Sequence, residues 1–155
     1  MRYFLDCEFN GFGGELISLA LVPAHAPHPV LYLVITDVAA PLDRWVRRNV
    51  LTVLDDVPEG VTILRVDREA AARTLGAYLR ADDSETVIVA DWPDDIALLC
   101  KLLLTGPGEM VATHQRTQFE LVRVNSYPTE VAGAVRHNAV WDAMALRTRL
   151  AGYWS

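Results

Sequence analysis

The chain has 155 residues, of which 52% are hydrophobic and 22% are charged. This composition excludes a disordered chain, and the length suits one domain with its own core, so we expect a single domain over residues 1–155. The formal net charge of −6 argues against a large surface for nonspecific nucleic-acid binding, which would be basic.

The first third of the chain predicts three β-strands joined by short connections. Residues 2–6 (RYFLD) are apolar with an acid at the end, and residues 15–22 and 30–36 are rich in aliphatic residues. The segment NGFGG at 10–14 holds three glycines and predicts a tight turn. Three consecutive strands with short links predict an antiparallel meander.

The remainder of the chain predicts alternating helices and strands. Short helices are expected over 41–50 and from 67 to about 80, where Asp67 can cap a stripe of Ala71, Leu75 and Leu79. A strand over 86–91, a helix that Asp94 or Asp95 begins, a strand over 118–124 and a helix from about residue 139 follow. This order predicts an α/β fold with a mixed sheet.

The sequence also indicates where the protein resides. Its apolar stretches are strand-sized and interrupted, so none can span a bilayer, and the N-terminal residues lack the apolar run and cleavage site of a secretory signal. Cys7 and Cys100 are too few for a disulfide framework or a thiolate metal site. We therefore expect a cytoplasmic protein with reduced cysteines and no membrane partner.

Asp6 and Glu8 form the first candidate site. In an extended chain alternate side chains share a face, so the two carboxylates point the same way from the expected strand end. Adjacent carboxylates raise each other's pKa unless a cation joins them, and a hard divalent ion such as Mg²⁺ prefers oxygen ligands. The alternative is a pair of solvated charges, which is the common meaning of an isolated D-x-E.

His137 and Asp142 form the second candidate site. His137 precedes the last expected helix and Asp142 lies in its first turns, so an imidazole and a carboxylate can converge there. A neutral histidine near pH 7 can take a proton from water. The alternative is a surface histidine beside an acid that stabilises the helix start.

The segment ADWPDDIALL at 90–99 offers three more acids. Asp94 and Asp95 are expected at the helix entrance as N-cap and dipole partners, whatever else they do. Counting from the strand end favours Asp95 as a site residue, and Asp91 and Asp94 stay open.

The segments LDCEF (5–9), DWPDDIALL (91–99) and HNAVWDA (137–143) together resemble the three motifs of the DEDDh family of 3′-5′ exonucleases. The chain most resembles the small bacterial and phage RNase T-like 3′-5′ exoribonucleases, over nearly its whole length. The resemblance implies an RNase H-like fold and two divalent metal ions, Mg²⁺ or Mn²⁺.

The resemblance also implies a role for each matching residue. Asp6, Glu8 and Asp142 would hold a metal ion, Asp6 would bridge to a second ion, Asp95 would support that second ion, and His137 would be the general base. Residues that follow the motif acids would bind the terminal nucleotide: Asn10, Gly11, Phe12 and Asn138. For Phe12, stacking on a base and capping the core are equally open.

The implied activity is removal of nucleoside 5′-monophosphates from the 3′ ends of single-stranded RNA or of 3′ overhangs, by a homodimer. The alternatives are a DNA exonuclease, a dinucleotide phosphodiesterase, and a non-catalytic nucleic-acid-binding module. Three residues are candidates for phosphate contacts: Arg116, Arg123 and Arg136. Three tryptophans are expected in the core or an interface, where the tail Tyr153-Trp154 would also fit: Trp45, Trp141 and Trp154.

Overall fold

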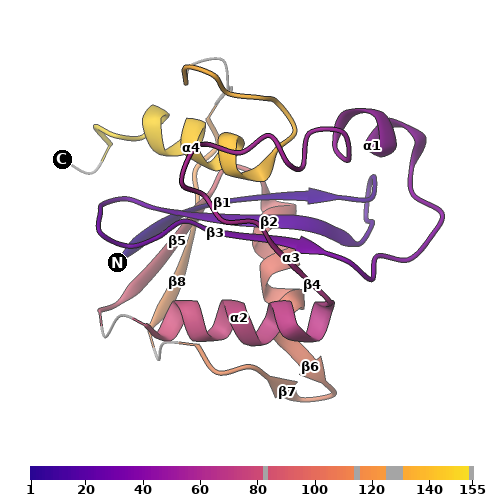
Figure 1. Ribbon diagram of the computed structural model, residues 1–155. Helices are drawn as coiled ribbons and strands as arrows, with labels where there is room; N and C mark the ends of the chain where they lie inside the picture. Colours follow the sequence, from indigo (N-terminus) through magenta and orange to yellow (C-terminus); the bar gives the residue numbers. More distant parts are fainter. Residues whose placement is uncertain (82–83, 114–115, 125–130, 154–155) are drawn as a thin grey trace.

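The structure, a computed structural model, describes residues 1–81, 84–113, 116–124 and 131–153. Its centre is a six-stranded mixed sheet in the order β4-β3-β2-β1-β5-β8 (Figure 1). β1 (Arg2–Phe9), β2 (Leu16–Pro23) and β3 (Leu31–Ile35) pair antiparallel in sequence order, which confirms the predicted meander. Three parallel pairs complete the sheet: β4 (Leu64–Val66) on β3, β5 (Thr86–Ala90) on β1, and β8 (Thr117–Leu121) on β5.

Helices cover both faces of this sheet, so the molecule has three layers (Figure 1). α1 (Arg44–Asn49) and α4 (Ala139–Arg149) lie on one face, and α2 (Arg68–Arg80) and α3 (Pro93–Leu103) on the other. The alternation of β1 supplies both cores, because Phe4 packs toward α4 while Tyr3 and Leu5 pack toward α2 and α3. This α/β architecture is compatible with an RNase H-like fold without being specific to it.

α2 shows how the sequence pattern sets a helix. The Asp67 carboxylate caps it by accepting the backbone N–H of Ala70 at 2.8 Å, as expected. Ala71, Leu75 and Leu79 are buried in the core between α2 and the sheet, so the predicted apolar stripe is confirmed.

Several expected boundaries differ from the structure, and the helix expected over 41–50 spans only Arg44–Asn49. β1 continues to Phe9 rather than ending at residue 6, because its pairing with β2 runs through Glu8. α3 begins at Pro93 with Trp92 as N-cap, so the predicted N-cap role of Asp94 or Asp95 is wrong; proline suits the first helical position because it has no N–H to satisfy. β8 ends at Leu121 rather than at residue 124.

Two features had no predicted counterpart. β4 is only three residues long and is defined by its pairing with β3. A small hairpin of β6 (Leu104–Gly106) and β7 (Glu109–Met110) follows α3. Such short strands carry too little alternation to be recognised from sequence.

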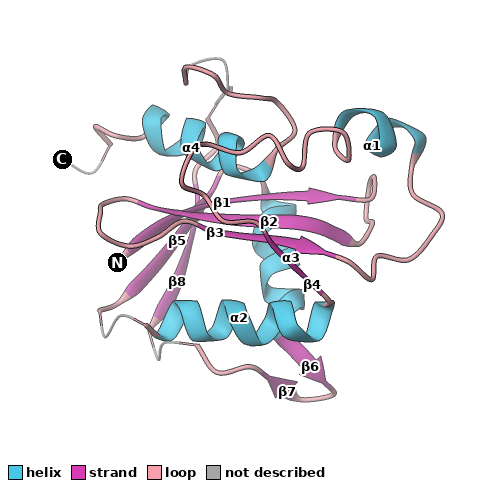
Figure 2. Cartoon of the chain, viewed as in Figure 1, coloured by secondary structure: helices cyan, strands magenta, loops and turns pink. Residues whose placement is uncertain are grey.

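α1 is a short helix between two long connections that join β3 to β4 (Figure 2). Its N-cap Asp43 accepts the backbone N–H groups of Trp45 and Val46, and only Val46 of the helix is buried. β1 runs toward α1, whereas the N-terminus and the C-terminal end of α4 lie near the opposite end of the sheet (Figure 1). None of the helices in the described part of the chain is long and apolar enough to span a bilayer.

Candidate metal centre

β1 places two carboxylates on the sheet face that α4 covers. Asp6 and Glu8 alternate with Cys7 and share a face with Phe4, which packs in the core beside α4. Their register partners on β2 are Ala20 and Ser18. The two acids therefore lie within a paired strand, and the expected position at a strand end is corrected.

β5 brings a third acid to the same point. The parallel register pairs Phe4 of β1 with Val89 of β5, and continuing it by two residues sets Asp91 beside Asp6. Asp95 follows in the first turn of α3, where it is only 2% exposed. The Cys7 thiol contacts the Asp95 carbonyl at 3.8 Å, which ties α3 to β1.

α4 supplies the last acid from the opposite layer. Asp142 lies in its first turn, and its Oδ2 accepts the backbone N–H of His137 at 3.1 Å. The buried Asn138 caps the helix by accepting the N–H of Val140 at 3.1 Å. The helix start is thus fixed by hydrogen bonds that aim Asp142 at the sheet.

These acids form two groups that share one residue. Asp6, Glu8 and Asp142 offer carboxylate oxygens within 4.8 Å of one another, and so do Asp6, Asp91 and Asp95. Each group has the ligand type and number that a hard divalent cation binds in proteins. Acidic groups on β1, directly after β5, on α3 and on α4 can therefore hold metal at this end of the central strands.

The burial of Asp95 fits a cation in particular. Its Oδ2 is buried and has no hydrogen-bond partner in the part of the chain that the structure describes. A buried charged oxygen without a partner is costly. A metal ion held with Asp6 and Asp91 would remove that cost.

The electrostatics of the cluster favour a cation as well. Burial first, and then the neighbouring acids, raise the pKa of Asp6 well above its ordinary value. Burial and Asp142 raise the pKa of Glu8 to about 8, and burial and Asp91 raise the pKa of Asp95 to about 8. Burial also raises the pKa of Asp142 to about 7. Without metal, the acids therefore bind protons near neutral pH, and a bound divalent cation would relieve the same repulsion between carboxylates.

His137 borders the acids in an uncommon backbone conformation. Its φ of 62° lies in the left-handed region, which costs energy for a residue other than glycine. Its ring packs edge-on against Trp45 with the centroids 4.8 Å apart. Burial and the nearby Arg136 lower the pKa of His137, which favours the neutral form of its imidazole. A neutral ring can accept a proton.

The structure distinguishes the three acids that follow β5. Asp91 and Asp95 both join the group that contains Asp6. Asp94 instead accepts a hydrogen bond from the Trp92 indole N–H at 2.8 Å. Asp95 therefore lies where the motif spacing indicated, and Asp91 accompanies it.

The glycine loop after β1 is fixed by its own hydrogen bonds. Asn10 Oδ1 accepts the N–H of Asp43 at 2.7 Å, and its amide donates to the Pro41 carbonyl at 3.3 Å, so Asn10 holds the loop before α1. The N–H of Gly11, which has φ 72°, donates to Phe9. The backbone N–H of Asn10 donates to the Glu15 carbonyl at 2.8 Å, so the backbone N–H groups of both residues, which were expected to bind the terminal nucleotide, are already used within the loop.

Phe12 is fully exposed at the tip of this loop, which rules out a role in capping the core. It lines a cavity of about 350 Å³ beside Glu8. Trp45 and Trp92, 51% and 46% exposed, line the same cavity. Trp45 is therefore not a core residue, and its expected place in an interface stays a prediction. Neither tryptophan was expected at the site.

Asn138 has a structural role instead of the expected substrate contact. It is fully buried, and in addition to capping α4 its amide donates to the Val53 carbonyl at 2.8 Å. Of the other tryptophans, Trp141 is half-buried and its indole N–H donates to the Asp56 carbonyl at 2.6 Å. Trp154 lies outside the described residues.

The three candidate arginines for phosphate contacts separate in space. Arg123 stacks over the Trp92 ring at 4.6 Å and donates to the Asp91 carbonyl, so it adjoins the acids. Arg136 is exposed and close enough to lower the pKa of Asp142. Arg116 pairs with Glu85 at the other end of β5 and β8 and does not reach the cluster.

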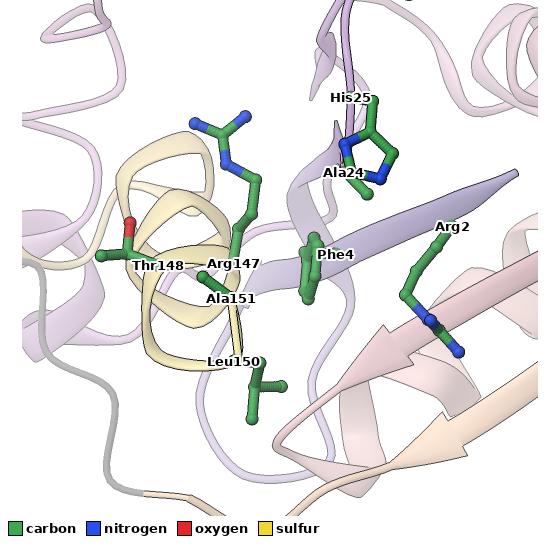
Figure 3. A pocket seen from close by; sticks show the side chains of 8 residues that line it. All are labelled: Arg2, Phe4, Ala24, His25, Arg147, Thr148, Leu150 and Ala151. Atoms are coloured by element: carbon green, nitrogen blue, oxygen red, sulfur yellow. The ribbon is translucent and has the colours of Figure 1, made fainter. Parts of the chain in front are cut away.

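A second cavity lies beside the C-terminal end of α4 and has a volume of about 480 Å³. Arg2, His25 and Arg147 line it above an apolar floor that includes Phe4 (Figure 3). In Figure 3 the guanidinium groups of Arg2 and Arg147 extend in different directions, and each has a protein acceptor: Glu120 at 3.3 Å and the Pro23 carbonyl at 3.3 Å. Among the described residues, no set of reactive groups converges there.

No protein-family model matches the chain, and no curated protein matches its sequence significantly. Function is therefore inferred from the geometry of the acids, from His137 and from the three motifs that carry these residues.

Proposed function

We propose that this protein is a metal-dependent 3′-5′ exoribonuclease of the DEDDh type, which releases nucleoside 5′-monophosphates from RNA 3′ ends. The observation that carries the proposal is the pair of three-acid groups that share Asp6. Four of these five acids occupy the motif positions that resemble this family, and two-metal hydrolysis of phosphodiesters needs such paired sites.

Two divalent ions, Mg²⁺ or Mn²⁺, fit these residues. Glu8, Asp142 and Asp6 would hold one ion, and Asp6, Asp91 and Asp95 would hold the other. When bound, the ions supply charge stabilisation at phosphorus and lower the pKa of water. The buried Asp95 oxygen and the raised pKa values of the acids support this assignment.

His137 is the general base in this proposal. Its lowered pKa keeps the imidazole able to accept a proton from water at neutral pH. Trp45 against the ring, and the backbone hydrogen bond from His137 to Asp142, limit the movement of His137. Such positioning contributes to the rate because the base need not be ordered during the reaction.

The aromatic cavity supports a single-stranded end as the substrate. Phe12, Trp45 and Trp92 are exposed around the cavity beside Glu8, and exposed aromatic rings bind bases that are free to leave their stack. RNA in preference to DNA rests on the family resemblance. A homodimer likewise stays a prediction: Tyr153 is 67% exposed, and light scattering would test it.

A timed gel of 5′-labelled RNA and DNA oligomers, with Mg²⁺, Mn²⁺ or chelator, tests the proposal. We expect a ladder that shortens from the 3′ end of RNA only when metal is present. Asp6→Asn keeps the side-chain shape but removes the ligand that both groups share, so activity should fall by at least about a thousandfold.

The matched control is Asp55→Asn, which removes an exposed acid that pairs with Arg65; it should keep full activity. If neither RNA nor DNA is shortened with either metal, the exonuclease proposal is wrong. Preferential cleavage of DNA, or cleavage of dinucleotides alone, would replace it with the corresponding alternative.

A further inference from the structure

Helix α1 carries three arginines in a chain whose net charge is −6. Arg44, Arg47 and Arg48 are all exposed. In the described part of the chain, no ion pair or side-chain hydrogen bond is formed by any of the three. α1 is therefore a local basic surface next to an acidic site.

Stability of the helix does not account for all three. Arg47 and Arg48 lie in the last turn, where a cation interacts favourably with the helix dipole. Arg44 lies at the first helical position, the end where a cation is unfavourable. Its charge has no structural benefit that the described residues show, so a ligand is the better explanation.

The arginines on one side of α1 adjoin the aromatic cavity. Arg44 and Arg48, four residues apart, line a shallow hollow of about 690 Å³ together with Asp43, Trp45 and Asn49. Asp43 and Trp45 also line the cavity beside Glu8. A continuous surface thus runs from the acids, past Trp45, to the two guanidinium groups, and Arg47 is not part of its lining.

We infer that Arg44 and Arg48 bind the backbone phosphates of nucleotides on the 5′ side of the terminal one. This inference rests on the proposed function and deepens it, because it makes a single-stranded oligonucleotide, rather than a dinucleotide, the substrate. Guanidinium groups bind phosphate oxygens with paired hydrogen bonds. Trp45 marks the boundary between the terminal nucleotide and the next one.

Asp43, which also lines the hollow, does not strongly oppose phosphate binding by Arg44 and Arg48. The Asp43 carboxylate is engaged with the N–H groups of Trp45 and Val46 at 2.7 and 3.3 Å. Elsewhere near the site, Arg123 is committed to Trp92 and to the Asp91 carbonyl. Arg44 and Arg48 are thus placed to continue a phosphate path beyond the aromatic cavity.

The test compares wild type with Arg44→Gln/Arg48→Gln on a dinucleotide, a pentamer and a longer single-stranded RNA. The matched control, Arg47→Gln/Arg149→Gln, removes the same charge from two exposed arginines outside the hollow. We expect KM for the longer RNA to rise about tenfold or more in the first variant, with kcat and dinucleotide cleavage changed less than about twofold.

A salt series gives a second readout. Each phosphate contact to a single strand contributes about 0.7 to the slope of log affinity against log salt, so the first variant should lose about 1.4 of that slope. The control should lose much less, and circular dichroism should show that both variants fold.

Each outcome separates the inference from the proposed function. If wild type shortens RNA and the two double variants lose affinity equally, net charge is responsible and the path along α1 is wrong. If the first variant weakens the dinucleotide as much as the longer RNA, the path is also wrong while the exonuclease stands. If wild type shortens no oligomer, the proposed function fails, and the inference with it.

Discussion

The two ends of the molecule along β1 differ in how their charged groups are arranged. At the end near α1, four partly or fully buried carboxyls with raised pKa values gather within reach of one another. At the other end, Arg2 and Arg147 border a cavity, but each guanidinium has a protein acceptor (Figure 3). Cavity size does not separate the two ends; the clustering of buried like charges does. Buried like charges that the protein leaves uncompensated indicate a ligand, whereas compensated charges indicate structure.

The largest effect that sharpens this contrast is expected from His137→Ala. Loss of a general base should lower kcat by about 10²–10⁴-fold, measured as RNA shortening at pH 7. Stabilisation by Mg²⁺ should persist, because the two acid groups do not include His137. The control at the other end is His25→Ala in an exposed loop, which should leave kcat unchanged. Loss of Mg²⁺ stabilisation in His137→Ala would show that the histidine instead maintains the acid cluster.

The next prediction concerns how the free energy of unfolding depends on pH and on Mg²⁺. The folded-state pKa values of Glu8 and Asp95, about 8, and of Asp142, about 7, lie above their unfolded values. The stabilisation from these groups is complete below their ordinary pKa near 4 and is lost as pH rises through 7 to 8. In chelator, the free energy of unfolding of wild type should therefore fall between pH 5 and pH 8.

Mg²⁺ should reverse this loss. Stabilisation by about 2.7 kcal/mol is expected at a hundredfold excess over Kd, and it should be greater at pH 8 than at pH 6, because protons compete with the ion. Urea titrations at both pH values measure it, and Asp6→Asn should reduce both the pH dependence and the metal response. Equal stabilisation of wild type and Asp6→Asn by Mg²⁺ would place the ion elsewhere.

Phe12→Ala should separate an effect on RNA binding from an effect on stability at the end of the molecule that holds the acids. Because Phe12 is fully exposed, Phe12→Ala should change the free energy of unfolding by no more than about 0.5 kcal/mol. Loss of a stacked base should weaken RNA binding by about 1–3 kcal/mol, read as KM. Met110→Ala is the control, since it removes an exposed apolar side chain from β7. An unchanged KM in Phe12→Ala would remove the loop tip from the substrate path.

Local patterns were sufficient to predict much of this arrangement. The meander follows from apolar segments separated by turn residues, and α2 follows from its cap and stripe. The shared face of Asp6 and Glu8 depends only on strand alternation, which holds even though β1 is longer than expected. Features that a few neighbouring residues determine are therefore visible in the sequence.

Three features that depend on distant contacts were not predicted from local patterns. Asp91 reaches Asp6 through the parallel pairing of β1 with β5, and no local pattern encodes that register. Trp45 is exposed because its neighbour Val46 takes the buried position on α1. Asn138 is occupied by α4 and by Val53, a contact between residues 85 positions apart. In each case, tertiary contacts decide whether the residue is buried in the core, caps a helix or lies at the candidate site.

The smallest predicted effect tests the opposite end directly. Arg147→Gln removes a 3.3 Å hydrogen bond to the Pro23 carbonyl and a cation from the last turn of α4, which together should cost about 1 kcal/mol of unfolding free energy. RNA cleavage should keep its KM and kcat, because the guanidinium lies at the far end of the helix from Asp142. A severalfold rise in KM with normal stability would mean that the cavity in Figure 3 binds substrate. The presence of a protein acceptor for each guanidinium would then no longer distinguish this end of the molecule from the end that holds the acids.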